Sequence, residues 1–456
     1  MSAAKAPSER RVIARHAATV LVGQLAVMAF GVTDTIVAGR YAESALAALS
    51  VGSAVYVTVY VSLMGGLQAL LPVWAELHGA GRTEEVGASV RQSLYLCAVA
   101  IVLGMALLLA PGPLLRLAEV PLAMQDEIEA YLRVLAFALA PALLFRMFST
   151  LSQGLGRPRL VAWLQLASFG VKLPLSVWFA FGGAGLPALG LVGCGWATLA
   201  VNYLMLAAAL WLLRQRPEFR TYRFWRRPEP PDAAQLRQFV RLGLPAGLAV
   251  LVEVTSFTLM ALFIARLGTA ALAAHQIASN LMAVGYMLPL SFSLATSARV
   301  SFWLGAGDHA LARRACRNGF ELTLLAALAF AGSIALLRHP LAGIYTEDPQ
   351  VLALALAASL LLATAGYHLA DSVQTLCVFV LRCFRVTVAP LVLYCALLWG
   401  FGLGGSYLLA YRGIGPWPAM ESPLAFWMMS AVALALTAVL FLGLLATALR
   451  TLRPPR

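Results

Sequence analysis

The sequence predicts an all-α polytopic membrane protein with twelve transmembrane helices in two six-helix bundles related by a pseudo-twofold axis. Three observations predict this fold: the composition, a series of long apolar spans and an internal repeat. Of the 456 residues, 61% are hydrophobic and only 12% are charged, about half the charged fraction of a soluble domain. Most of the chain is therefore expected to lie in lipid.

Twelve apolar spans alternate with shorter polar segments. Each span reaches the roughly 20 residues that a helix needs to cross a hydrocarbon core of about 30 Å, and several are long enough to tilt. The spans are predicted at residues 12–38, 45–77, 88–110, 124–152, 160–182, 188–213, 238–265, 271–304, 315–337, 350–381, 386–410 and 424–449.

The second half of the chain repeats the first half at a constant offset of 226 positions. The matching groups are Arg40 with Arg266, Ala45-Leu46-Ala47-Ala48 with Ala271-Leu272-Ala273-Ala274, Gly79-Ala80-Gly81 with Gly305-Ala306-Gly307, and Arg91 with Arg317. A repeat of this kind determines the architecture. Because six spans per half is an even number, both halves enter the membrane from the same side, with a twofold axis along the membrane normal and a cleft between them.

This arrangement divides the chain into two lobes and a tether. We predict an N-lobe at 1–216, a cytoplasmic linker at 217–236 and a C-lobe at 237–456. The linker is rich in Pro and Arg, a composition typical of a stiff spacer.

The basic residues predict the orientation of the spans. With the spans placed as above, 24 Lys and Arg residues fall on one side of the membrane and 5 on the other. Cytoplasmic loops carry such an excess, so both termini and the linker are expected in the cytoplasm. The net charge of +13 then reflects topology and anionic lipid headgroups rather than nucleic-acid binding.

Four charged residues stand out within the predicted spans: Asp34, Lys172, Glu253 and Asp371. A charge near the bilayer centre costs about 2.5–3.5 kcal/mol on insertion scales, so each is a candidate functional residue. The repeat pairs none of them with another charge, which indicates that the two lobes share a scaffold but not their chemistry.

Neutral oxygen donors accompany the acids of the second half. Tyr367, Asp371 and Gln374 share one helical face at i, i+4 and i+7. Ser256 follows Glu253 by about one turn. In the eighth span, Gln276 and Asn280 are spaced i, i+4 and are candidate lining residues.

Carboxylates with neutral oxygen donors suit a proton or Na⁺, so Glu253 and Asp371 are candidate ligands of a Na⁺ site. Burial favours the protonated form of a carboxyl group, and the Tyr367 ring offers a π face to a cation. The alternative is that these acids only hold helices together through hydrogen bonds.

Several function classes lack their motifs in this sequence. It contains no GxxxxGK[ST] phosphate loop, no HExxH pair and no TVGYG filter. We therefore expect neither an enzyme nor a resident cofactor. The energy source would be an ion gradient, in which one charge crossing 100 mV is worth about 2.3 kcal/mol.

The motifs together resemble the multidrug and toxic compound extrusion (MATE) family, in particular its bacterial norfloxacin-exporter branch. The resemblance rests on Thr33-Asp34-Thr35, Gly39-Arg40, Gln153-Gly154-Leu155-Gly156-Arg157, Gly190-Leu191-Val192-Gly193, Gly243-Leu244-Pro245 with Glu253, His275-Gln276-Ile277, Gly305-Ala306-Gly307-Asp308, Tyr367 and Asp371. It implies that Glu253 and Asp371 hold a coupling cation in the second lobe and that Asp34 is a cation or proton site in the first.

Two positions depart from the family pattern. Lys172 and Ser176 flank Pro174 where the family commonly has two asparagines. An ammonium group near Asp34 would pair with it, so we expect Lys172 to occupy the first-lobe cation site and the second lobe to be the working site. The other departure is Thr19, at a position where many relatives carry a first-helix proline, so kinking of that helix is not expected to be part of the cycle.

The resemblance further implies an antiporter in the bacterial inner membrane, acting as a monomer among membrane lipids. It would export amphipathic, mostly cationic drugs in exchange for Na⁺ or H⁺. One alternative is a lipid-linked oligosaccharide flippase of the same superfamily, although the acidic membrane-centre residues oppose it. A membrane-embedded transferase is a third class, but no pair of acids has metal-like spacing at the boundary of a span.

Overall fold

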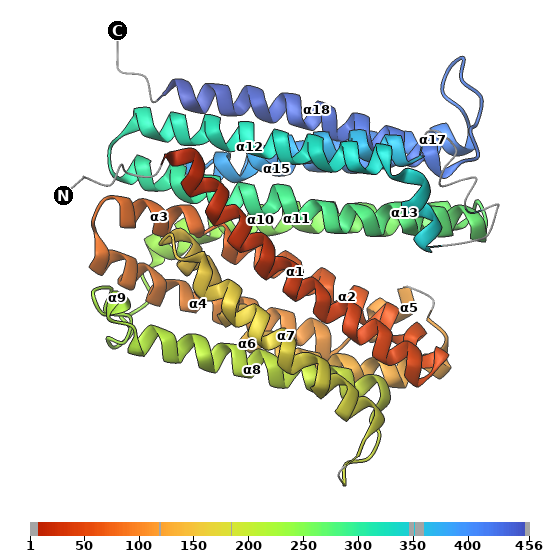
Figure 1. Ribbon diagram of the computed structural model, residues 1–456, viewed down its shortest axis with the longest axis horizontal. Helices are drawn as coiled ribbons and strands as arrows, with labels where there is room; N and C mark the ends of the chain where they lie inside the picture. Colours follow the sequence, from red (N-terminus) through yellow and green to blue (C-terminus); the bar gives the residue numbers. More distant parts are fainter. Residues whose placement is uncertain (1–7, 118–119, 184, 346–350, 352–359, 452–456) are drawn as a thin grey trace. The chain divides into compact units, whose positions relative to one another are not determined.

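The computed structural model describes residues 8–117, 120–183, 185–345, 351 and 360–451, which are almost entirely helical (Figure 1). The helices are α1 (Glu9–Tyr41), α2 (Glu43–Gln68), α3 (Leu71–Gly79), α4 (Thr83–Leu109), α5 (Gly112–Leu117), α6 (Leu122–Gly154), α7 (Pro158–Phe181), α8 (Gly190–Gln215), α9 (Pro217–Arg220), α10 (Ala233–Ala265), α11 (Thr269–Gly305), α12 (His309–Leu336), α13 (Arg338–Tyr345), α15 (Leu360–Cys383), α16 (Val388–Tyr394), the π-helix η1 (Cys395–Gly404), α17 (Gly405–Tyr411) and α18 (Pro423–Arg450).

The predicted fold class is confirmed. Among the described residues, eleven helical segments are long and apolar enough to cross a membrane. The twelfth is α15, whose polar residues reduce its hydropathy. Its predicted span began at 350, and residues 350 and 352–359 lie outside the described part of the chain.

The chain divides into two compact units. One unit is Val22–Gly247, and the other combines Leu248–Arg456 with the chain up to Leu21. We call them the first and the second unit. The divisions fall inside α1 and α10 rather than at 216 and 237, and the lobe boundaries taken from the sequence stay a prediction.

Close packing explains why the start of α10 belongs to the first unit. A Cβ atom at Gly247 would lie 2.6 Å from the backbone oxygen of Ser62, and one at Gly243 would lie 2.9 Å from that of Gly66. The Gly243-x-x-x-Gly247 spacing puts both glycines on one face, where they let α10 approach the backbone of α2.

Ion pairs explain why the start of α1 belongs to the second unit. Arg299 of α11 forms a bidentate pair with Glu9, and its guanidinium lies over the rings of Phe302 and Trp303 at 5.0 and 5.1 Å. Ile13, one turn after Glu9 on α1, is fully buried.

In the first unit, α6 packs against α2, α4 and α8, and α7 packs against α8. The core of this unit is built largely from Leu and Ala, with the fully buried Trp74. The single predicted span at 45–77 is in fact two helices, α2 and α3. Pro72 accounts for the break, because its ring excludes the carbonyl of residue 68 from a continuous helix.

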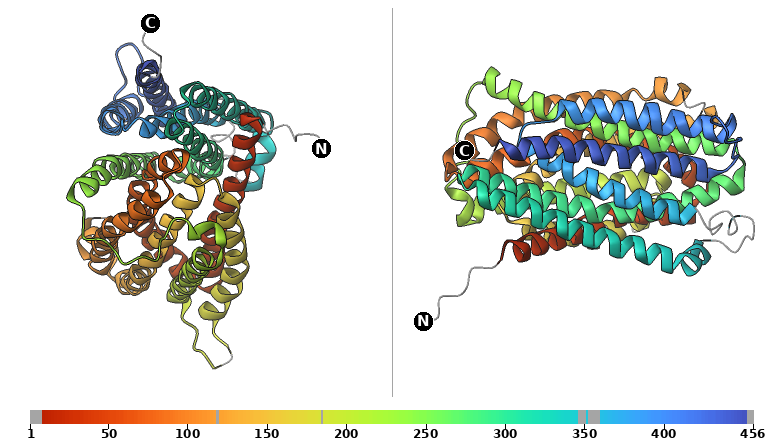
Figure 2. Two further views of the ribbon diagram at one scale, coloured as in Figure 1. Left: turned by 90° about the vertical axis from the view of Figure 1, so that its left-hand side faces the viewer. Right: turned by 90° about the horizontal axis from the view of Figure 1, so that it is seen from above.

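In the second unit, α15 packs against α11, α12 and α18, and these long helices run side by side (Figure 2). The predicted span at 386–410 is also interrupted, since α16 passes into ten residues of π-helix before α17. Such wide turns are uncommon and occur frequently at functional sites.

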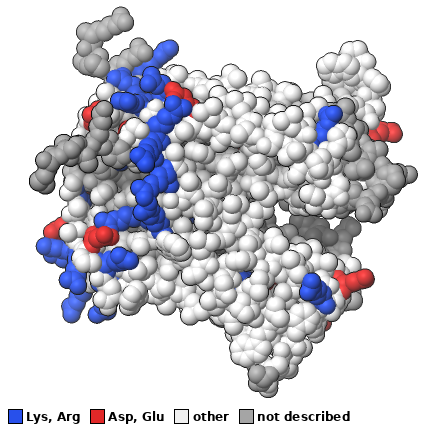
Figure 3. Space-filling model, in the orientation of Figure 1, with Lys and Arg blue, Asp and Glu red and all other residues white. Residues whose placement is uncertain are grey.

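The linker is fastened onto the first unit. Arg91 of α4 forms a bidentate pair with Glu229 and donates to the Arg223 carbonyl at 2.7 Å, while the Tyr95 hydroxyl donates to the Glu229 carbonyl at 2.9 Å. We call residues 217–232 the strap. Within each unit, Lys and Arg side chains gather at one end of the helices, and the other end carries few (Figure 3).

Candidate functional site

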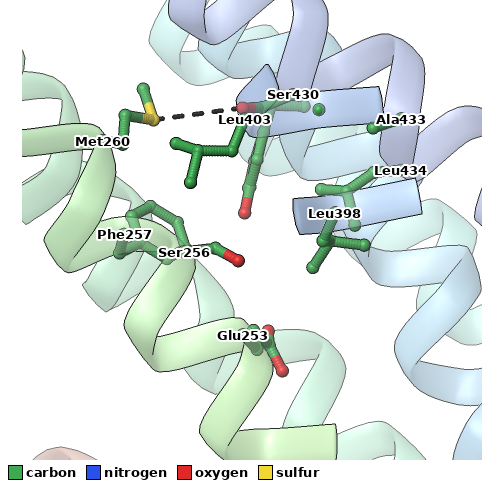
Figure 4. A pocket seen from close by; sticks show the side chains of 11 residues that line it. Glu253, Ser256, Phe257, Met260, Leu398, Leu403, Ser430, Ala433 and Leu434 are labelled. Atoms are coloured by element: carbon green, nitrogen blue, oxygen red, sulfur yellow. Dashed lines mark hydrogen bonds between the residues drawn. The ribbon is translucent and has the colours of Figure 1, made fainter. Parts of the chain in front are cut away.

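Glu253 of α10 faces a small pocket inside the second unit. Ser256, Phe257 and Met260 line it from the same helix, and Leu398 and Leu403 of the π-helix line the opposite side (Figure 4). The cavity measures about 30 Å³, more than the roughly 10–15 Å³ that one water requires. The pocket therefore has room for an ion or a few waters but not for a drug-sized molecule.

An aromatic wall closes one side of this pocket. The Tyr367 ring, which is also part of the lining, meets the rings of Trp427 and Phe257 edge to face, with centroids 5.3 and 5.8 Å apart. This geometry is favourable for aromatic pairs. Tyr367 and Ser256, both named as candidate site residues from the sequence, thus lie beside Glu253 in this pocket.

Asp371 lies one turn after Tyr367 on α15 and is buried. The Gln374 amide donates to its Oδ1 at 2.7 Å, and the Tyr394 hydroxyl donates to the amide oxygen of Gln374. Asp371, Gln374 and Tyr394 therefore form a chain of hydrogen bonds that ends where the π-helix begins. Sequence reasoning missed Tyr394, because a tyrosine in an apolar span carries no periodic signal.

Glu253 interacts electrostatically with Asp371 and with Arg382, the basic residue in the last turn of α15. Arg382 is buried over the Phe379 ring at 4.3 Å, and its Nε and Nη1 have no hydrogen-bond partner among the described residues. When both acids are ionised, the carboxylates of Glu253 and Asp371 and the guanidinium of Arg382 give the site a net charge of −1. That balance favours a single monovalent cation.

Gln276 and Asn280 lie elsewhere. Both side chains are on the exposed face of α11, and neither lines the pocket around Glu253. Within the described residues, no cluster of three or more His, Cys, Asp and Glu side chains has metal-binding geometry. The donors that meet here are carboxylates and hydroxyls, which suit a proton or a hard monovalent cation.

A wider groove lies next to this pocket in the second unit. It measures about 820 Å³ and is lined by Phe263 of α10, Arg266 directly after that helix, Trp399 and Phe401 of the π-helix, and Tyr407 of α17. Leu403 lines both cavities. The π-helix therefore separates an ion-sized pocket from a groove within the range of about 300–1,000 Å³ usual for small-molecule sites.

The first unit holds the other predicted pair. The Lys172 ammonium lies 2.7 and 3.0 Å from the two carboxylate oxygens of Asp34, and Ser176 donates to Oδ1 at 3.1 Å. The predicted pairing of Lys172 with Asp34 is thus present. The helix that carries Lys172 continues through Pro174, and α1 is continuous through Thr19.

Comparison with known proteins places the chain among transporters. A family model described as MatE matches residues 20–178 and 245–408. A protein of Aromatoleum aromaticum named "Probable multidrug resistance protein NorM" is 38% identical, over 95% of this chain and 93% of its own length. Proteins of the same name from Neisseria meningitidis serogroup B and Chromobacterium violaceum are 34% and 33% identical, covering 91% and 98% of this chain and 91% and 96% of their own lengths.

Solved structures support the fold. A eukaryotic MATE transporter superposes with a TM-score of 0.85 at 16% identity, with 98% of both chains covered. A Vibrio cholerae MATE transporter in a bent form gives 0.82 at 20% identity, with 97% of this chain and 98% of the other covered. An outward-facing multidrug resistance transporter of the same family gives 0.86 at 16% identity, with 98% of each chain covered.

Proposed function

The chain belongs to the MatE family, and on that premise we propose that it is a secondary antiporter that exports amphipathic, mostly cationic drugs in exchange for Na⁺ or H⁺. The observation that carries the proposal is the ion-sized pocket at Glu253, within electrostatic reach of Asp371. The relatives named as probable multidrug resistance proteins support the export of drugs.

The proposed cycle uses alternating access. A cation from outside binds at the second-unit carboxyls, Glu253 and Asp371, and cancels the one negative charge that remains beside Arg382. This favours the state that releases drug outward. When the cation leaves toward the cytoplasm, the two carboxylates are ionised and unoccupied again, and they attract a cationic drug. The excess of Lys and Arg at one end of the helices supports an orientation in the bacterial inner membrane with both termini in the cytoplasm.

We further propose that the apolar body of the drug lies in the groove lined by Trp399, Phe401 and Tyr407. Aromatic faces and the nearby Met429 give adaptable apolar contact, which suits a binding surface for varied compounds. Because Leu403 borders both cavities, ion occupancy and drug contact would be linked through the π-helix.

Drug efflux from inverted vesicles, with sodium and pH gradients imposed separately, tests this proposal. We expect one of the two gradients to drive efflux, and Glu253→Gln or Asp371→Asn to abolish its effect. Asp126→Asn, an exposed acid at the start of α6, is the matched control and should leave efflux unchanged. Efflux that responds to neither the sodium gradient nor the pH gradient would contradict antiport. Rescue of cell-wall or polysaccharide synthesis without drug resistance would favour the flippase.

A further inference from the structure

The Lys172 ammonium has the surroundings of a bound monovalent cation. Four oxygens lie within 3.1 Å of Nζ: both Asp34 carboxylate oxygens at 2.7 and 3.0 Å, the Thr198 hydroxyl at 2.7 Å and the Cys194 carbonyl at 3.1 Å. An ammonium has three donors and no acceptor. Each donor therefore has an oxygen to meet, although the Lys172 side chain is fully buried.

Among the described residues, no second charge near Asp34 competes for the ammonium. Ser176 donates to Asp34 Oδ1 at 3.1 Å, and Thr198 donates to the Cys194 carbonyl at 3.0 Å, so its lone pairs stay available to Lys172. The other titratable groups that face Asp34 are the Cys194 thiol on α8 and the Tyr131 phenol on α6. The pair is therefore neutral as a whole.

The supporting elements fix the ammonium in this position. Asp34 comes from α1, Lys172 and Ser176 from α7, and Thr198 from α8, so the ammonium joins three helices. A buried ion pair is strongly destabilised when one partner is removed, because the remaining charge stays buried without a partner. Ion exchange at Asp34 would therefore require the Lys172 ammonium to leave these four oxygens.

We propose that the pocket around Asp34 is a monovalent-cation site whose permanent occupant is the side chain of Lys172. In the intact protein this carboxylate then exchanges no ion, and removing the ammonium opens a latent site for Na⁺, K⁺ or a small alkylammonium ion. The inference deepens the proposed function, since it confines ion exchange to the second unit. Its test does not depend on transport.

The experiment uses the full chain in lipid nanodiscs, with Glu253→Gln and Asp371→Asn added to remove the second-unit carboxylates. Lys172→Ala in this background should melt at a lower temperature than the background itself. Ammonium, ethylammonium or butylammonium chloride should raise that temperature saturably by several degrees, at constant ionic strength. Tetramethylammonium, which has no N–H group, should have no effect. The background protein should respond to none of these salts.

A neutral variant provides the matched control. Asp34→Asn combined with Lys172→Ala lacks the carboxylate, so ammonium should no longer stabilise it. If Lys172→Ala alone does not fold, Lys172→Met keeps the aliphatic stem and leaves the head-group space open, and it should gain binding of about one ²²Na⁺ per chain.

Two results would overturn the proposal. One is an absence of any selective response to ammonium or Na⁺ in both Lys172 variants. The other is a loss of bound ²²Na⁺ when Asp34→Asn and Lys172→Met are introduced together into the protein with its second-unit carboxylates intact, because that loss would mean that Asp34 binds an exchangeable ion despite Lys172.

Discussion

Tyr394 donates a hydrogen bond to the amide oxygen of Gln374, and the NH₂ end of the same amide donates to Asp371. An ionised carboxylate only accepts hydrogen bonds, so it requires the NH₂ end of Gln374. A protonated Asp371 donates a hydrogen bond, and a bound Na⁺ requires oxygen ligands. Both states therefore favour contact with the amide oxygen of Gln374. The observed arrangement therefore stabilises the site without its cation.

Replacing Tyr394 with Phe should make the cation bind more tightly. Without the hydroxyl, Gln374 is free to turn its oxygen toward an occupied Asp371. One hydrogen bond is worth about 1 kcal/mol, so the Na⁺ or H⁺ concentration for half-maximal efflux should fall about fivefold. Tyr411→Phe is the control, because its hydroxyl donates to the Phe263 carbonyl outside the site. If the ion concentration for half-maximal efflux is the same in wild type and Tyr394→Phe, the contact between Tyr394 and Gln374 does not affect cation binding.

Trp399→Ala should weaken drug export without changing its ion dependence. The indole lines the groove and donates to the Val252 carbonyl at 3.2 Å. Loss of an aromatic face costs about 1.4 kcal/mol, so the apparent KM for an aromatic cationic drug should rise about tenfold. Trp211→Ala, an exposed tryptophan on α8, should leave KM unaltered. If Trp399→Ala instead changes the ion concentration for half-maximal efflux, Trp399 belongs to the cation site.

The strap should loosen in acid. The Arg91 guanidinium bonded to Glu229 lowers the pKa of that carboxyl to about 2 from a usual 4.5. A lowered pKa in the folded state gives a stability contribution that is present above pH 4.5 and is lost as the pH falls toward 2. Solvent screening keeps this contribution small, because the Glu229 side chain is 43% exposed.

Hydrogen exchange of residues 217–232 measures this effect. Exchange should accelerate between pH 4.5 and 2 in the wild type, after correction for the intrinsic rate. Glu229→Gln should show fast exchange already at pH 6 and little further change with pH. If the exchange rates of the two proteins depend on pH in the same way, Glu229 does not cause the loosening of the strap in acid.

Gly247→Ala should destabilise the protein, whereas Gly332→Ala should not. The added methyl at Gly247 would lie 2.6 Å from the Ser62 backbone oxygen, and that at Gly332 meets no atom within 4 Å. Overpacking costs about 1–3 kcal/mol. Thermal unfolding in detergent should therefore give a lower melting temperature only for Gly247→Ala. If both variants melt alike, α2 and α10 do not pack as closely as described.

Much of this architecture was predictable because the relevant signals are local. Long apolar spans, the constant offset between halves and intramembrane charges can all be read directly from the sequence. Pairing of Lys172 with Asp34 was predictable as well, because the family resemblance puts the position of Lys172 near the first-helix aspartate, and an ammonium and a carboxylate pair when they lie close together in an apolar setting. Glu253 and Tyr367 were assigned to one site through the same resemblance, because no local pattern connects α10 with α15.

Other features depend on tertiary packing and left no sequence signal. The π-helix at Cys395–Gly404 lies in an apolar stretch that reads as an ordinary helix. Gln276 and Asn280 share a helical face, but the spacing alone does not say whether that face turns toward Glu253. The division inside α1 arises from Arg299 and Glu9, which are 290 residues apart.

The attachment of the strap to α4 has a practical consequence for measuring motion. A spectroscopic label in the strap should travel as one body with the helices of residues 22–247, because Arg91 and Tyr95 hold it there. A second label on α12 would follow the other body. The distance between the two labels, recorded with and without drug, would then report whether the two units move relative to each other.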